Sequence, residues 1–272
     1  MEPMACIVAA VLRESRPRRL VAECYPPGRD GWGERSLREK FARLGGDPST
    51  GLAGAALSEL ARFYPAHCPN DYLPSLAQAL LESIRGRGWW QTPPPELVEC
   101  ATADTIALAC SVREILAELP PRAGSRPYTP YVLLTKFLHF AFPSTFAICD
   151  AQAAASIQMW SYLAYRADQH ERKDYLLKDL VDVTGKGYAA VLSFYRLFWN
   201  AASSGQRAEL ERLAAGISAS LGIKGPGAGT VTTLSLLDKL LWLANGDPRL
   251  LGLYGDAGWL SSEQSSTLAL RQ

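Results

Sequence analysis

Residues 131–160 read YVLLTKFLHFAFPSTFAICDAQAAASIQMW. The apolar spacing over residues 130–142 predicts an apolar helix. Pro143 and Ser144 then predict a turn, and residues 146–149 form a short apolar return. Asp150 follows the return, and because aspartate is a favourable N-cap it predicts the start of a second helix.

Helical spacing continues on both sides of this segment. Helices are predicted at about residues 34–44, 52–64, 72–84, 95–119, 150–166, 171–183, 187–202, 206–221 and 231–244. Alternating runs of β-branched residues are nearly absent, so few segments of the sequence have the pattern of a β-strand. We therefore expect an all-α fold, a single unit of two helical lobes (1–125 and 126–260) that share a central cleft, followed by a tail (261–272).

Two stretches rich in glycine or proline predict loops. GRGWWQTPPPE at 86–96 predicts a surface loop, because three consecutive prolines cannot continue a helix. GIKGPGAGT at 222–230 predicts a mobile loop or hinge. This second segment follows no predicted strand and lacks a GKS or GKT ending, which argues against a nucleotide-binding loop.

The composition argues against several classes of protein. The chain has 272 residues, 48% of them hydrophobic, which suffices for a substantial core, yet no apolar run approaches the roughly 20 residues of a membrane span. The six cysteines form no CxxC pair, so we expect reduced thiols, a cytoplasmic location and no metal site. The start lacks the basic region and cleavage site of a secretion signal. A net charge of +1 is not the strongly basic balance of many nucleic-acid binders, although a local basic patch remains open.

The order of apolar helix, turn, apolar return and aspartate in residues 131–160 resembles the catalytic core of the helix-hairpin-helix DNA glycosylase superfamily. This resemblance implies a substrate of double-stranded DNA with one base flipped out, hydrolysis of an N-glycosidic bond, and no cofactor. It also implies that Asp150 faces the flipped nucleotide. Family members carry a Gly-rich hairpin of the form LPGVG before the buried helix, whereas SRPYTPY stands there in this chain. The phosphate contacts would then come from Arg126, from amides of the turn, or from elsewhere.

Asp150 and Lys136 are the expected catalytic residues. Glycosidic cleavage passes through an oxocarbenium-like sugar, which an adjacent carboxylate stabilises, and a helix N-terminus favours the charged form of Asp150. An aspartate that merely caps its helix would look the same in sequence. Lys136 interrupts an apolar helix, so it could contact phosphate, pair with Asp150 or attack the sugar as an amine.

Extrusion of a base requires aromatic or apolar surfaces that receive it. The expected substrate-binding residues are His139, Trp160, Tyr128, Tyr131, Trp89 and Trp90, with the two loop tryptophans as candidate wedges. The alternative for the aromatic residues is a place in the hydrophobic core, where most aromatic residues at helical spacing lie. His139 could likewise be a buried core histidine. Expected DNA-phosphate contacts are Arg126 and Lys186, the latter in a Gly-bearing helix junction. Arg35, Arg38 and Arg43 form either a further phosphate-binding group or a solvated face.

The function expected from these residues is excision of a modified or damaged base by a monomeric glycosylase. Its atypical hairpin suggests a divergent specialist, such as one acting on modified bases of invading phage DNA. Two alternatives remain: a non-catalytic helical DNA-binding module, and an interaction module that packs a partner through LLDKLLWLANG at 236–246.

Overall fold

The computed structural model describes residues 34–64, 68–121, 130–150, 186–223 and 227–245, together with the single positions 8, 11, 12, 20, 153 and 157. Within these ranges the chain forms α-helices, one short 3₁₀ helix and no strand, which confirms the all-α prediction for this part of the protein. None of the helices described is both long and apolar enough to cross a membrane.

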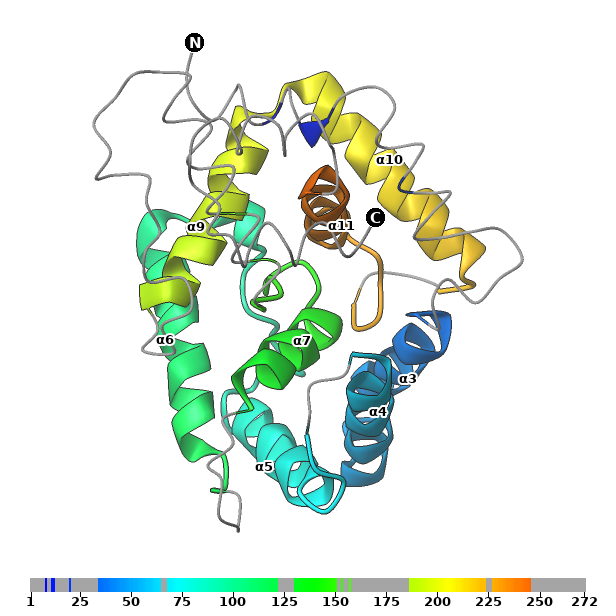
Figure 1. Cartoon of the computed structure of the whole chain (residues 1–272), viewed down its shortest axis with the longest axis vertical. Coiled ribbons are helices and arrows are strands. Elements are labelled where there is room, and N and C mark those ends of the chain that lie inside the picture. The colour runs from blue at the N-terminus through cyan, green and yellow to red at the C-terminus, as the bar shows by residue number, and fades with distance from the viewer. Residues whose placement is uncertain are drawn as a thin grey trace, which may run out of the picture.

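The first three long helices pack in sequence order along one side of the molecule (Figure 1). They are α3 (Glu34–Gly46), α4 (Thr50–Phe63) and α5 (Leu73–Gly86). Helix α4 begins where the Ser49 hydroxyl accepts a hydrogen bond from the Leu52 amide, a standard N-cap. A 3₁₀ turn, η2 (Leu97–Glu99), then leads to α6 (Thr102–Glu118).

Three more helices follow later in the described part of the chain. They are α9 (Lys186–Ala201), α10 (Ser204–Ser220) and α11 (Thr233–Asn245). Helix α9 packs against α6 and η2, and α10 packs against α11. Ser203 and Gln206 form a reciprocal capping box at the start of α10, which explains why the chain turns into a new helix directly after α9.

Helix α7 (Tyr131–Ala141) lies in the middle of this arrangement (Figure 1). All of its residues except Val132 are buried, and it packs against α3, α4 and α6. Phe41 of α3 contacts both Phe137 and Phe140, with ring centroids 5.1 and 5.4 Å apart. A helix that is apolar on nearly all sides is stable only as a core element, and α7 takes that position here.

Arg38 forms a buried ion pair with Glu34 inside α3 and also hydrogen-bonds the loop that precedes α11. The Arg38 Nε donates to Glu34 at 2.9 Å, and its Nη1 donates to the carbonyl oxygens of Gly229 and Thr230 at 3.2 and 2.7 Å. Burial alone would raise the pKa of Glu34, but the charges of Arg38 and Lys239 outweigh it and lower that pKa. Arg38 is therefore neither a phosphate ligand nor part of a solvated face, because its side chain is 1% exposed.

The described end of the glycine-rich segment, residues 227–230, packs against α3 and α7. Gly229 donates its amide to the Phe140 carbonyl oxygen at 2.8 Å, so residues 227–230 are fixed to the end of α7. Gly229 has φ +79°, and a Cβ at this position would collide with the backbone carbonyl oxygen of Arg38. Glycine therefore serves here for close packing of backbone on backbone.

Helix boundaries follow the sequence closely, with one clear exception. Residues 95–119 are predicted as one helix, whereas the structure has η2, an extended Cys100 and Ala101, and then α6. The break has a physical reason: Leu97 donates its amide to Ser144 in the turn after α7, so the segment before α6 is shaped by a tertiary contact. The predicted helices at 150–166 and 171–183 and the tail lie outside the described residues, apart from Asp150 and from Ala153 and Ile157, of which the last two are helical.

Gly229 provides a test of this packing. Alanine at this position would combine a left-handed backbone with a clash against α3, so we expect Gly229→Ala to lower the free energy of unfolding by more than about 2 kcal/mol. Gly216→Ala is the matched control, because nothing lies within 4 Å of a Cβ at this exposed position in α10. The control should stabilise the protein by up to about 1 kcal/mol. Urea unfolding measures both changes, and equal effects would contradict the close packing at Gly229.

Candidate functional site

The return segment, residues 146–149, has no regular secondary structure and is fully buried, with exposed fractions of 0 to 4%. Buried backbone groups need hydrogen-bond partners, and this segment has no neighbouring strand to supply them among the described residues. The Phe146 amide donates to the Phe142 carbonyl oxygen at 3.2 Å, and side chains supply further partners. Tyr188 of α9 donates its hydroxyl to the Ala147 carbonyl oxygen at 2.8 Å, and Thr135 of α7 accepts from the Cys149 amide at 3.3 Å.

His139 completes this support from α7. Its Nδ1 lies 2.8 Å from the Phe146 carbonyl oxygen and its Nε2 lies 3.2 Å from the Ser235 hydroxyl. Burial, together with the charge of Arg38, lowers the pKa of His139 to about 3, so the ring is neutral. The carbonyl can only accept, so Nδ1 carries the proton and Nε2 accepts from Ser235. Both ring nitrogens are thus occupied within the protein, and a contact of His139 with substrate stays a prediction without geometric support.

Asp150 follows the return segment and is held at both carboxylate oxygens. Its Oδ1 accepts a hydrogen bond from the Ala153 amide at 2.9 Å, in the first turn of the next helical stretch, and its Oδ2 pairs with the Lys136 Nζ at 2.9 Å. The Lys136 side chain is 8% exposed, whereas that of Asp150 is 22% exposed. The two residues predicted as catalytic are therefore in direct contact, and the carboxylate is the more accessible partner.

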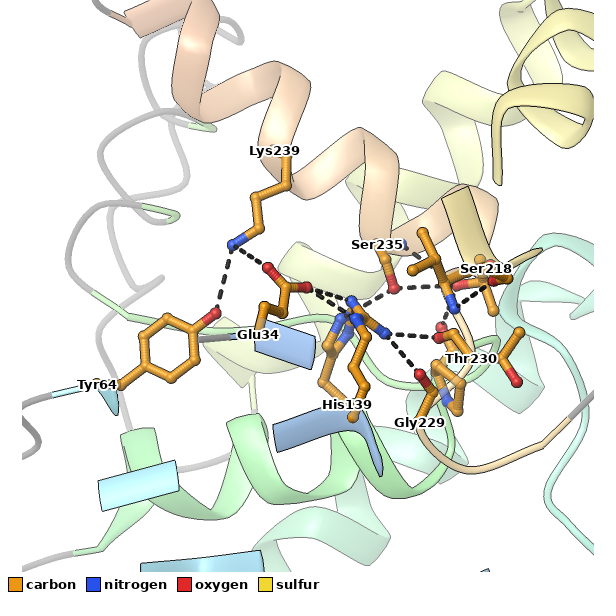
Figure 2. A network of polar contacts seen from close by, with 12 residues as sticks. Glu34, Tyr64, His139, Ser218, Gly229, Thr230, Ser235 and Lys239 are labelled. Carbon is orange, nitrogen blue, oxygen red and sulfur yellow. Dashed lines mark hydrogen bonds and ion pairs between the residues drawn. The ribbon is translucent and has the colours of Figure 1, made fainter. Parts of the chain in front are cut away.

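Tyr64 lies against the same pair. The Lys136 Nζ lies 4.2 Å from the centre of the Tyr64 ring, which is a cation–π contact. Lys239 of α11 approaches Tyr64 too and donates to its hydroxyl at 3.3 Å, while its Nζ lies 3.9 Å from Glu34 (Figure 2). Burial raises the pKa of Tyr64 to about 12, so the phenol is neutral. Figure 2 shows Lys239 between Tyr64 and Glu34, which connects Asp150 to the buried ion pair of α3 through Lys136 and Tyr64.

A second carboxylate, Asp238, precedes Lys239 on α11. The Tyr195 hydroxyl of α9 donates to the Asp238 Oδ1 at 3.2 Å. No cation of the described residues lies within ion-pair distance of Asp238, because Lys239 turns toward Glu34. Burial raises the pKa of Asp238 to about 6, the charge of Lys239 lowers it, and the charge of Asp150 raises it further. Among the described residues, the site therefore holds one carboxylate paired with lysine and one with no cation within ion-pair distance.

The remaining sequence-predicted residues lie apart from this cluster or beyond the described part of the chain. Trp89 and Trp90 are half-buried and pack against Phe142, with ring centroids 5.8 and 5.2 Å away. Tyr131 is buried and packs edge-on against Tyr188. Positions outside the described residues are Trp160, Tyr128 and Arg126, and Lys186 is described only as the first residue of α9.

Sequence reasoning missed Asp238, Lys239, Tyr64 and Tyr195. One signal could have found the first two: an Asp-Lys pair interrupts the apolar helix LLDKLLWL, as Lys136 interrupts α7. The two tyrosines carried no comparable signal, because aromatic residues at helical spacing usually belong to the core.

The described residues offer no metal site, since no group of three or more histidine, cysteine, aspartate or glutamate side chains converges among them. An open pocket of about 430 Å³ lies between the end of α3 and the loop before α11. Arg43, Gly46, Gly227 and Thr230 are among its lining residues, and the Asp150 cluster is not. The cluster therefore offers acid–base and electrostatic chemistry built from carboxylates, lysines and tyrosines.

His139 gives this site a measurable pH signature. Its pKa is about 3 in the folded protein against 6.5 for the free side chain, so the unfolded chain binds the extra proton between these values. The neutral His139 ring therefore contributes its full share to the free energy of unfolding above pH 6.5. This contribution is lost as the pH falls below that value, by about 2 kcal/mol between pH 7.5 and 5. We expect His139→Gln to lose this component, as measured by urea unfolding at both pH values. The same decrease in the variant would contradict the neutral, buried ring.

No family model matches the chain, and searches of curated proteins and of solved structures gave no match either.

Proposed function

We propose that the protein is a DNA glycosylase that flips a modified or damaged base and hydrolyses its N-glycosidic bond. The observation that carries this proposal is the Asp150 carboxylate, which is fixed at both oxygens and still 22% exposed. In this proposal Asp150 faces the sugar carbon C1′ of the flipped nucleotide, as the resemblance of residues 131–160 to the glycosylase core implies.

The surroundings of Asp150 suit a carboxylate that must stay charged during the reaction. An amide at the start of a helix and the Lys136 ammonium both favour the ionised form. As the glycosidic bond breaks, positive charge develops on the sugar, and a fixed carboxylate stabilises that charge without reorganising. A surface aspartate that only capped its helix would need neither the buried lysine nor the supported segment that precedes it.

Lys136 takes a positioning role in this mechanism. The Lys136 Nζ is engaged with the Asp150 carboxylate and lies over the Tyr64 ring, so the nitrogen is directed to these two groups and not toward the sugar. This favours hydrolysis by water over a covalent Schiff-base route. Lys136 then fixes the carboxylate and keeps its charge in place.

The proposal extends to the wider architecture. DNA would lie in a cleft between two lobes, 1–125 and 126–260, with Asp150 at the start of the helical stretch that follows α7. Phosphate contacts are assigned to Arg126 and Lys186, in place of the Gly-rich hairpin that the family carries. This departure supports a specialised substrate, such as a modified base of invading phage DNA.

Excision from a panel of duplexes tests the proposal. Each duplex carries one modified or damaged base, and alkali after incubation converts an abasic site into a strand break. We expect the wild type to cleave at least one of them, and Asp150→Asn to lower the single-turnover rate by about a hundredfold or more. Asparagine is also a good N-cap, so the variant should keep the helix start and the fold.

Asp104→Asn is the matched control, because Asp104 accepts a hydrogen bond from the Ala101 amide at the start of α6, a different helix. It should leave excision unchanged. Absence of strand breaks with every duplex would contradict the enzymatic proposal, and binding of DNA without excision would instead indicate a helical DNA-binding module. An unchanged rate in Asp150→Asn would exclude Asp150 as the stabilising carboxylate.

A further inference from the structure

Tyr64 is the aromatic residue of the cluster to which the steps above assign no role. It caps the C-terminal end of α4, where its amide donates to the Leu60 carbonyl oxygen at 2.9 Å. Its hydroxyl accepts a hydrogen bond from Lys239 of α11 at 3.3 Å (Figure 2), and its ring packs against Phe140 of α7 with centroids 6.3 Å apart. The ring and the hydroxyl are therefore held by two other helices.

The same ring contacts the lysine that holds Asp150. Lys136 and Phe140 are four residues apart on α7, so they lie on one face of that helix, and the Tyr64 ring reaches both. The Lys136 Nζ lies 4.2 Å from the ring centre and 2.9 Å from the Asp150 Oδ2. Because only 8% of the Lys136 side chain is exposed, the ring face and the carboxylate replace water around the ammonium.

A lysine by itself holds a carboxylate loosely. Its ammonium is a compact charge on a flexible four-carbon chain, and it lacks the planar, two-pronged geometry of an arginine. A second contact restricts the positions that the ammonium can take. The Tyr64 ring supplies this contact from α4, and since Lys239 and Phe140 hold the ring, it is a fixed surface for Lys136.

We infer that Tyr64 is a positioning residue, whose ring holds the Lys136 ammonium against the Asp150 carboxylate. This inference rests on the proposed glycosylase function and extends the machinery of that function to α4. Tyr64 contacts no reacting atom, and it acts on the sugar through Lys136 and Asp150. The aromatic face carries this role and the hydroxyl does not, because Lys239 also lies 3.9 Å from Glu34.

A double-mutant cycle on stability tests the contact without any enzymatic activity. Tyr64→Leu removes the ring, Lys136→Met removes the ammonium, and the unfolding equilibrium constant is measured in urea for each variant and for their combination. We expect Tyr64→Leu to raise this constant at least about threefold more in the wild type than in the Lys136→Met background. Tyr72→Leu is the matched control, because the Tyr72 hydroxyl donates to the Pro120 carbonyl oxygen. Its effect should be equal in both backgrounds.

Excision tests the positioning role itself, with the duplex of the panel that the wild type cleaves most rapidly. Tyr64→Leu should lower the single-turnover rate about tenfold or more and leave the dissociation constant of the duplex within about twofold, because Tyr64 acts on Asp150 and not on the DNA. Tyr64→Phe keeps the aromatic face and should stay within about twofold of the wild-type rate.

Two further comparisons separate positioning from a general loss of stability. In the Lys136→Met background, Tyr64→Leu should cause no further loss of rate, because the group that it positions is gone. Tyr72→Leu destabilises the fold without removing the ring over Lys136, so it should keep the wild-type rate at a temperature where the variant is folded.

Additive effects in the stability cycle would overturn the contact, whatever reaction the protein performs. An unchanged rate in Tyr64→Leu, or an equal loss of rate in Tyr64→Phe, would overturn the positioning role of the ring while leaving the glycosylase proposal intact. Failure of the wild type to excise any base would instead contradict the proposed function itself, and the positioning role of Tyr64 with it.

Discussion

The site depends on how a buried, irregular stretch of backbone is hydrogen-bonded where the described residues offer no neighbouring strand. Residues 146–149 carry amide and carbonyl groups into the core, and such groups are costly to bury unless they are hydrogen-bonded. Thr135, His139 and Tyr188 supply the partners from α7 and α9. Their hydrogen bonds fix the end of the segment, and the end of the segment is where Asp150 begins the next helical stretch.

A chain of polar contacts extends from Asp150 through the interior. Lys136 pairs with Asp150, Tyr64 lies between Lys136 and Lys239, and Glu34 joins Lys239 to Arg38. Buried ion pairs of this kind contribute little net stability compared with apolar packing, but breaking one of them leaves an uncompensated charge. The Lys136–Asp150 pair is the end of this network that reaches an accessible carboxylate, and it is this carboxylate to which the proposal assigns a chemical role.

Much of the fold and part of the site follow from the sequence. Helical spacing located α3 to α7 and α9 to α11 because each helix has one apolar face or is apolar all round. The contact between Lys136 and Asp150 was among the predicted possibilities, since a lysine in an apolar helix needs an acid. Asp238 and Tyr195 were missed because they belong to other helices, and tertiary packing alone brings them to the cluster. The break before α6 and the fixed Gly229 likewise arise from contacts distant in sequence.

Binding of two duplexes tests most directly whether Asp150 stabilises positive charge at the sugar. One duplex carries a neutral tetrahydrofuran in place of a nucleotide and the other a cationic pyrrolidine of the same shape, so neither depends on the identity of the excised base. We expect the wild type to bind the cationic duplex at least about tenfold more tightly, a difference of about 1.4 kcal/mol, and Asp150→Asn to lose most of that preference. Equal affinity of the wild type for both duplexes, or an unchanged preference in the variant, would contradict the role assigned to this carboxylate.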